Sequence, residues 1–132
     1  MFVLDTNVLS ALRRPDRAPQ VVRWLARQPE QDLFLSVITL GEVERGIVQQ
    51  DTRNPAFAAD LRLWLDRTVA LFSDRILPFG ADEARIWGRL SARLGHSGAD
   101  LLIAATALAR GAILVTGDTG FAATGARMAN PF

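Results

Sequence analysis

The chain opens with the stretch Met1-Phe2-Val3-Leu4-Asp5-Thr6-Asn7, in which four apolar residues are followed by three polar, turn-forming ones. An apolar run this short is typical of a buried strand that ends in a turn. Much later, Ala112-Ile113-Leu114-Val115-Thr116 repeats the pattern and runs into Gly117-Asp118-Thr119-Gly120. Two buried strands therefore each place an aspartate at their carboxyl end, which is the edge where doubly wound sheets bind ligands.

The segments between these strands alternate between strand-like and helical patterns. Leu33-Phe34-Leu35 indicates another strand, and Arg75-Ile76-Leu77-Pro78 indicates a short edge strand, because proline cannot donate a hydrogen bond into a sheet. Helices are expected over Pro19–Gln28, Val37–Gln50, Pro55–Phe72 and Ala81–Leu94, with a loop at Asp51-Thr52-Arg53-Asn54. This alternation predicts a three-layer α/β/α fold around a mainly parallel sheet, in a single domain spanning residues 1–132.

Two further carboxylates each lie three residues after a hydroxyl residue. Glu42 follows Thr39, and Asp100 follows Ser97. This is the capping-box spacing at a helix start. An acid in the first turn stabilises the helix by about 0.3–1 kcal/mol through its interaction with the helix dipole. Taken singly, each acid is explained as well by a helix cap as by a functional role. The aspartates at the two strand ends have an equally plain explanation as turn residues.

Together the four acids point to a metal site. Asp5, Glu42, Asp100 and Asp118 would meet at one sheet edge of a chain that has no cysteine and a single histidine. Carboxylates held this close repel one another, and without a cation some of their pKa values would rise strongly. Because only oxygen ligands are available, Mg²⁺ or Mn²⁺ is favoured over zinc or copper. Such an ion activates water and neutralises charge on a phosphate, so the pattern predicts phosphodiester hydrolysis.

Six segments, in order along the chain, resemble those of a known family. They are Leu4–Ser10, Leu35–Glu42 followed by Arg45-Gly46, Arg75–Pro78, Ala99–Ala107, Leu114–Thr116 and the closing Asn130-Pro131-Phe132. In these segments the chain resembles the PIN-domain ribonucleases, specifically the VapC-like toxins of type II toxin–antitoxin modules. The similarity spans nearly all of the 132 residues.

The resemblance implies a catalytic role for all four acids. It makes Asp5 and Asp100 the innermost ligands of Mg²⁺ or Mn²⁺, with Glu42 and Asp118 completing the acidic pocket directly or through water. It also implies RNA as the substrate, a homodimer, and a cognate antitoxin protein whose C-terminal segment blocks the pocket. A ribonuclease of this kind is expected to leave a 5′-phosphate and a 3′-hydroxyl.

Two polar neighbours are implied to orient the metal-binding carboxylates from behind, namely Asn7 and Thr116. A turn asparagine and a strand-end threonine that satisfies the backbone explain these two residues equally well.

Charge and composition narrow the function further. The net charge is +1, so affinity for nucleic acid must come from local placement, and all 15 basic residues are arginine. Arg13, Arg14 and Arg17 follow the first acidic motif and are the best candidates for substrate contacts. A second arginine series, expected to be a solvated helix face, comprises Arg85, Arg89 and Arg93.

The expected location is the cytoplasm. The chain has no cysteine for disulfides and no basic leader before an apolar stretch, and its longest apolar segment is far too short to span a membrane.

Two other functions are compatible with parts of the sequence. Asp118-Thr119-Gly120 resembles the aspartic-protease motif, but those proteases are built from strands, whereas helical patterns dominate here. The second alternative is a catalytically inactive PIN-like domain that binds RNA or a protein partner without turnover. The presence of all four acids argues against it.

Overall fold

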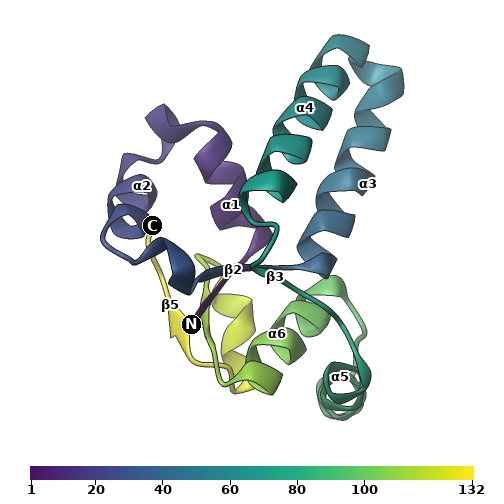
Figure 1. Ribbon diagram of the computed structural model, residues 1–132. Coiled ribbons are helices and arrows are strands. Elements are labelled where there is room, and N and C mark those ends of the chain that lie inside the picture. Colours follow the sequence, from purple (N-terminus) through teal and green to yellow (C-terminus); the bar gives the residue numbers. More distant parts are fainter.

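Five short parallel strands form the central sheet of the computed structural model, which describes all residues from 1 to 132. The strands are β1 (Phe2–Leu4), β2 (Leu33–Ser36), β3 (Ile76–Leu77), β4 (Ile113–Val115) and β5 (Met128–Ala129). All four pairings are parallel, and the order across the sheet is β3-β2-β1-β4-β5 (Figure 1). The strand order reverses between β1 and β4, so the carboxyl ends of these two strands flank the topological switch point.

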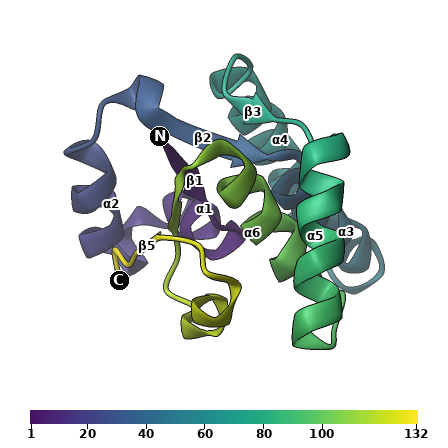
Figure 2. The ribbon, with the colours of Figure 1, turned by 90° about the horizontal axis from the view of Figure 1, so that it is seen from below.

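Helices cover both faces of this sheet. The α-helices are α1 (Thr6–Arg13), α2 (Pro19–Ala26), α3 (Val37–Arg53), α4 (Pro55–Leu71), α5 (Ala81–Leu94) and α6 (Ala99–Arg110). Three 3₁₀ turns are η1 (Pro15–Arg17), η2 (Glu30–Asp32) and η3 (Thr119–Thr124). Helices α1 to α4 lie on one side of the sheet and α5 and α6 on the other, with α5 packed against α6 (Figures 1 and 2). The predicted three-layer α/β/α fold is confirmed.

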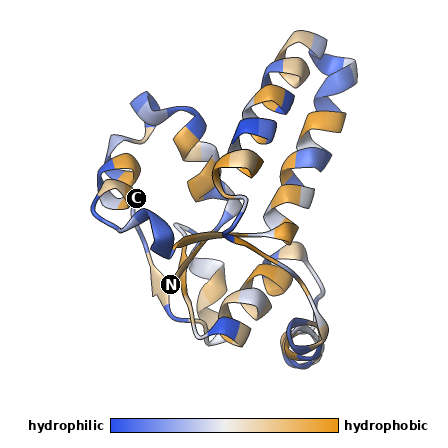
Figure 3. Cartoon of the chain, in the orientation of Figure 1, coloured by the Kyte–Doolittle hydropathy of each residue, from blue (hydrophilic) through white to orange (hydrophobic).

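Alternate residues of the central strands face opposite layers. Val3 and Leu114 belong to the core shared with α5 and α6, whereas Leu4 and Val115 belong to the core shared with α1 and α2. All four side chains are fully buried, and each contributes about 1.5–3 kcal/mol by leaving water. Burial on both faces explains why these strands are continuous apolar runs in the sequence, visible as hydrophobic strands at the centre of Figure 3.

Helices α3 and α4 form an antiparallel pair that projects away from the sheet (Figure 1). The predicted loop at residues 51–54 is largely wrong, because α3 continues to Arg53 and only Asn54 is non-helical. Asp51 accepts two hydrogen bonds from the guanidinium of Arg62 across the pair, at 2.7 and 2.6 Å. Asn54 then caps α4 by accepting a hydrogen bond from the N–H of Phe57. Side-chain pairing thus favours the last turn of α3 over a loop.

Most other predicted elements agree with the structure. Helix α5 has the predicted bounds, β3 is an edge strand as its proline suggested, and α2 and α4 end within two residues of the prediction. The sequence pattern missed α1, which replaces the turn expected after β1, and the two-residue strand β5. No helix is long and apolar enough to cross a membrane.

Candidate active site

Asp5 lies at the carboxyl end of β1 and is also the N-cap of α1. Its Oδ1 accepts a hydrogen bond from the backbone N–H of Thr6, and its Oδ2 accepts one from Thr116 Oγ1, both at 2.8 Å. The side chain is only 4% exposed. Because β1 runs into α1 without a loop, the predicted turn residue is a helix cap, and its carboxylate is held in one orientation.

Thr116 follows β4, the strand next to β1. Its hydroxyl donates to Asp5 and accepts a hydrogen bond from the backbone N–H of Asp118 at 3.0 Å. The single hydroxyl proton is therefore directed at the Asp5 carboxylate. The hydrogen bond joins residues 111 positions apart, so only the parallel pairing of β1 with β4 brings them together.

Glu42 approaches the same edge from α3. Its Oε1 accepts a short hydrogen bond of 2.6 Å from the hydroxyl of Thr6, whose oxygen also lies 3.4 Å from the buried Thr39 hydroxyl. The predicted capping box with Thr39 is wrong, because α3 begins at Val37 and Ser36 caps it. Glu42 is thus not a cap, and its partner is the residue after Asp5.

Asp100 is exposed in the first turn of α6. The predicted capping box with Ser97 is also wrong, since the N-cap is Gly98 and makes no side-chain hydrogen bond. Asp100 forms neither an ion pair nor a side-chain hydrogen bond. Its carboxylate is therefore free to meet a ligand.

Three of the four predicted acids interact electrostatically. Burial is the main influence that raises the pKa of Asp5; the hydrogen bonds from Thr116 and Thr6 lower it, and the charges of Asp100 and Glu42 raise it further. None of the three carboxylates forms an ion pair with an arginine. The edge thus brings three carboxyl groups near one another, and none of them is ion-paired.

The donor chemistry fits a hard divalent cation, because every titratable group at this edge is a carboxylate. The carboxylates do not, however, form a preassembled cage: no group of three acidic, histidine or cysteine side chains lies close enough to hold one ion. Asp5 and Glu42 are fixed by hydrogen bonds, so the exposed Asp100 is the side chain with the freedom to complete a coordination sphere.

The structure places two predicted site residues apart from this group. The Asp118 carboxylate caps η3 by accepting a hydrogen bond from the N–H of Gly120 at 2.8 Å, and it is not among the charges that shift the pKa of Asp5. What Asp118 contributes to the edge is its backbone N–H on Thr116. Asn7 is exposed on α1 and makes no side-chain hydrogen bond.

Sequence reasoning missed Thr6, which contacts both Asp5 and Glu42. The hydroxyl residue directly after a strand-end aspartate could have drawn attention to Thr6, but the sequence does not show that its partner is Glu42 in another helix. The predicted arginines Arg13, Arg14 and Arg17 do lie near one another, since the latter two lower the pKa of Arg13.

The fold and this acidic edge define the class of protein. The PIN-domain family model matches residues 2–127. The chain is 39% identical to the VapC ribonuclease Y4jK of Sinorhizobium fredii, over 100% of this chain and 98% of that protein. It is 34% identical to the toxin FitB of Neisseria gonorrhoeae, over 100% and 99% of the two chains.

Solved structures agree with these similarities. A crystal structure of FitAcB from Neisseria gonorrhoeae superposes with a TM-score of 0.85 at 35% identity, covering 99% of this chain and 98% of that one. A structure of FitAB bound to a DNA fragment gives a TM-score of 0.83 at 34% identity, covering 99% and 95%. The chain therefore belongs to the PIN-domain family and, within it, to the VapC ribonuclease toxins of type II toxin–antitoxin systems.

Proposed function

We propose that this ribonuclease hydrolyses RNA phosphodiester bonds with Mg²⁺ or Mn²⁺ held at the acidic edge by Asp5, Glu42 and Asp100. The observation that carries the proposal is the buried Asp5, whose pKa is raised by burial and by two neighbouring carboxylates, with no arginine paired to any of the three. A divalent cation removes this electrostatic conflict.

Each side chain has a distinct part in the proposed reaction. Asp5, oriented by Thr116 and by the Thr6 N–H, is the fixed innermost ligand. Glu42, held by the Thr6 hydroxyl, binds directly or through water, and the exposed Asp100 completes the coordination sphere. When bound, the ion lowers the pKa of a water molecule and neutralises the charge that develops on the phosphate.

Asp118 is proposed to act on the site through water and through its backbone N–H. That N–H donates a hydrogen bond to the Thr116 hydroxyl oxygen, so the hydroxyl proton remains directed at Asp5. The sequence-based proposal that Asn7 orients a carboxylate has no contact to support it, because its exposed side chain makes no hydrogen bond.

Cleavage of total RNA in Mn²⁺, Mg²⁺ or EDTA tests the proposal, with an Asp5→Asn, Asp100→Asn double variant prepared identically. We expect metal-dependent cutting that the double variant loses, and products with a 5′-phosphate and a 3′-hydroxyl. Asp82→Asn is the matched control, because Asp82 is likewise an exposed acid at the second position of a helix that follows a glycine N-cap.

Two results would count against the proposal. Products that end in a 2′,3′-cyclic phosphate would require attack by the ribose hydroxyl instead of water. A folded, metal-loaded protein that binds RNA without cutting it would favour a binding role for the domain.

We further propose a cognate antitoxin that blocks this acidic edge, and a homodimer of the toxin. Similar solved structures are complexes, among them a toxin–antitoxin complex from Klebsiella pneumoniae and VapBC2 from Rickettsia felis bound to a promoter DNA fragment. Copurification from an operon-derived expression plasmid, followed by light scattering, tests both points. We expect a second protein that suppresses cleavage, and a consistently solitary monomer would contradict both.

A further inference from the structure

A hollow of about 290 Å³ lies beside the acidic edge, between α1, α3 and α4. Thr6 and Glu42 form part of its wall, so it is continuous with the proposed catalytic residues. Arg13, Phe57 and Trp64 form other parts of the wall. A ligand in the hollow would therefore lie next to the proposed catalytic acids.

The walls of the hollow suit a flat, polar aromatic ligand. The guanidinium carbon of Arg13 lies 5.1 Å from the ring centroid of Phe57, so the planar cation is braced on an aromatic side chain. Trp64 offers a second aromatic surface, and Gln50 adds an amide that both donates and accepts hydrogen bonds. Unpaired bases of RNA are bound by such a combination of aromatic or guanidinium planes and hydrogen-bonding groups.

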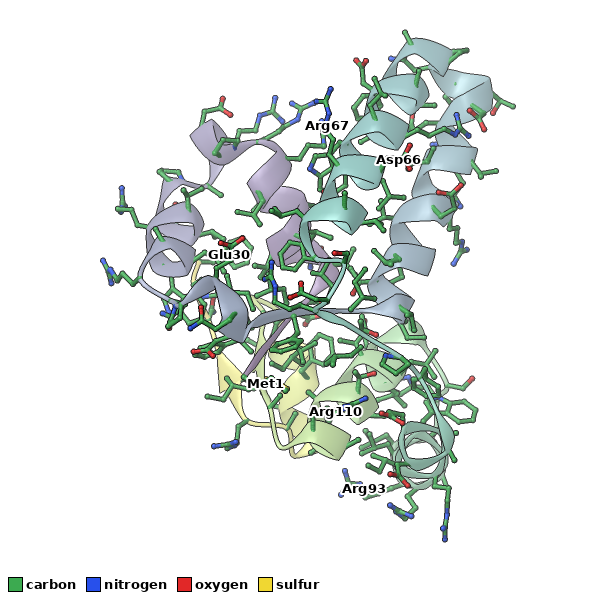
Figure 4. The ribbon with its side chains drawn as sticks, viewed as in Figure 1. Met1, Glu30, Asp66, Arg67, Arg93 and Arg110 are labelled. Carbon is green, nitrogen blue, oxygen red and sulfur yellow. The ribbon has the colours of Figure 1, made fainter.

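The charge around the hollow suits a phosphate backbone. Burial, Arg14 and Arg17 lower the pKa of Arg13, which means that three guanidinium groups lie near one another. None of them makes an ion pair or a side-chain hydrogen bond, and neither does Arg67 on α4. Figure 4 shows Arg67 on the side of α4 that faces the end of α1. The net charge of the chain is only +1, so these unpaired arginines form a local concentration of positive charge that favours binding of an anion.

We propose that the hollow is the subsite for the nucleotide that flanks the cleaved phosphodiester in single-stranded RNA. The base lies in the hollow against Arg13 and the aromatic side chains, and the adjoining phosphates lie along Arg13, Arg14, Arg17 and Arg67. This inference rests on the proposed ribonuclease function. An acidic polypeptide would satisfy the arginines but gives no reason for a base-sized hollow with aromatic walls.

Photo-crosslinking tests the position of the base directly. A random-sequence pool of short RNAs containing 4-thiouridine is irradiated with the wild-type protein in Ca²⁺ and, separately, in EDTA. Trypsin cuts after arginine, so Phe57 and Trp64 fall in the peptides of residues 54–62 and 63–67. We expect the RNA adducts on these two peptides. Adducts confined to the peptides that contain Trp24 or Trp87, or no adducts at all, would overturn the proposal.

Binding of the same RNA pool tests the arginines by fluorescence anisotropy over a range of salt concentrations. We expect Arg13→Gln to weaken binding by about tenfold and to reduce the salt dependence by about one phosphate contact, and Phe57→Ala to weaken binding without changing the salt dependence. Arg89→Gln, on the exposed face of α5, is the control and is expected to change affinity by less than about twofold. Equal effects of Arg13→Gln and Arg89→Gln would overturn the proposal.

A competition experiment separates the RNA subsite from a surface for a protein partner. The proposal would be wrong if polyglutamate displaces the RNA, if Arg13→Gln but not Phe57→Ala weakens polyglutamate binding, and if Phe57→Ala leaves RNA binding intact. In that case the arginines bind an acidic protein. Metal-dependent cleavage with crosslinks elsewhere would keep the nuclease and remove the subsite. Crosslinks in the hollow without any cleavage would support the RNA subsite and contradict the nuclease activity.

Discussion

Asp5 and Arg75 are both buried ionisable side chains, yet their surroundings are opposite. Arg75 is 7% exposed at the amino end of the edge strand β3, and Asp5 is 4% exposed at the carboxyl end of the central strand β1. Burying a charge costs several kcal/mol unless partners replace the lost water. The two side chains differ in where they find these partners.

Arg75 finds all of its partners within the fold. Its Nη1 donates to the carbonyl oxygens of Glu30 and Leu33 at 2.7 and 2.8 Å, and its Nη2 donates to that of Leu71 at 3.0 Å. Its guanidinium lies 4.6 Å from the ring centroid of Phe72. One cation thus ties η2, β2 and the end of α4 together, and nothing is left over for a ligand.

Asp5 finds only neutral partners and two neighbours of its own charge. The hydrogen bonds from Thr6 and Thr116 fix the carboxylate, but they do not neutralise it. A buried charge that the fold satisfies is structural, whereas a buried charge that the fold orients and leaves unbalanced is available for a cation.

Replacing Asp5 tests this contrast most strongly. We expect Asp5→Asn to reduce RNA cleavage on the order of 10³-fold, because a metal ion supplies several kcal/mol of transition-state stabilisation. In EDTA the variant is expected to be at least as stable as the wild type, because it removes a charge that burial and two carboxylates oppose. Single-turnover kinetics and chemical denaturation measure the two effects. Loss of stability together with activity would make Asp5 a structural residue like Arg75.

Replacing Arg75 is expected to have the converse effect. Arg75→Met leaves buried carbonyl oxygens without donors, so the free energy of unfolding is expected to fall by about 3 kcal/mol. Cleavage per folded molecule should stay unchanged. Arg62→Met, which removes the exposed ion pair with Asp51, is the control and is expected to have a much smaller effect. Denaturant titrations decide the point, and an unchanged midpoint for Arg75→Met would refute the role assigned to this cation.

Thr6 offers a finer test, because it is the one side chain that joins Glu42 to the turn at Asp5. We expect Thr6→Val to lower both Mn²⁺ affinity and the cleavage rate by about tenfold, as removal of a group that orients a metal ligand does. Thr6→Ser keeps the hydroxyl and should restore both. Calorimetry measures the metal affinity without RNA. Losses in the Ser variant that the Val variant does not share would instead assign the effect to packing of the methyl group, which valine keeps.

The pH dependence of stability is the smallest expected effect, because hydrogen bonds from Thr116 and Thr6 offset part of the influence of burial. The pKa of Asp5 is raised above its ordinary value of 3.8. At a pH between the ordinary pKa and the raised pKa of the folded protein, the folded chain keeps a proton on Asp5 that the unfolded chain has released. Stability is therefore expected to fall as the pH rises through this window.

Denaturation of the wild type and Asp5→Asn in EDTA, between about pH 4 and pH 7, isolates this contribution. The wild type should lose stability relative to the variant as the pH rises, and saturating Mg²⁺ should remove the difference. A relative gain with rising pH would mean that the carboxylate is stabilised as an anion by the fold itself.

Much of the architecture was predictable because it depends on local pattern. A strand that is buried on both faces must be apolar throughout, so β1 and β4 could be predicted from the sequence. Proline marked β3 as an edge strand. The helix expected from Val37 does begin there, directly after β2, and Ser36 caps it. The capping-box interpretation of Thr39 and Glu42 failed, because the spacing of a hydroxyl residue and an acid does not by itself say where a helix begins.

The sequence by itself determined the fold class, the family and the acids worth testing, because hydrophobic periodicity and motif order are written along the chain. Only the tertiary structure decided how those acids are held. The Thr116–Asp5 and Thr6–Glu42 hydrogen bonds join residues 111 and 36 positions apart, and the Asp118 carboxylate turns toward its own loop instead of the site. Such contacts depend on sheet order and helix placement, which no local pattern encodes.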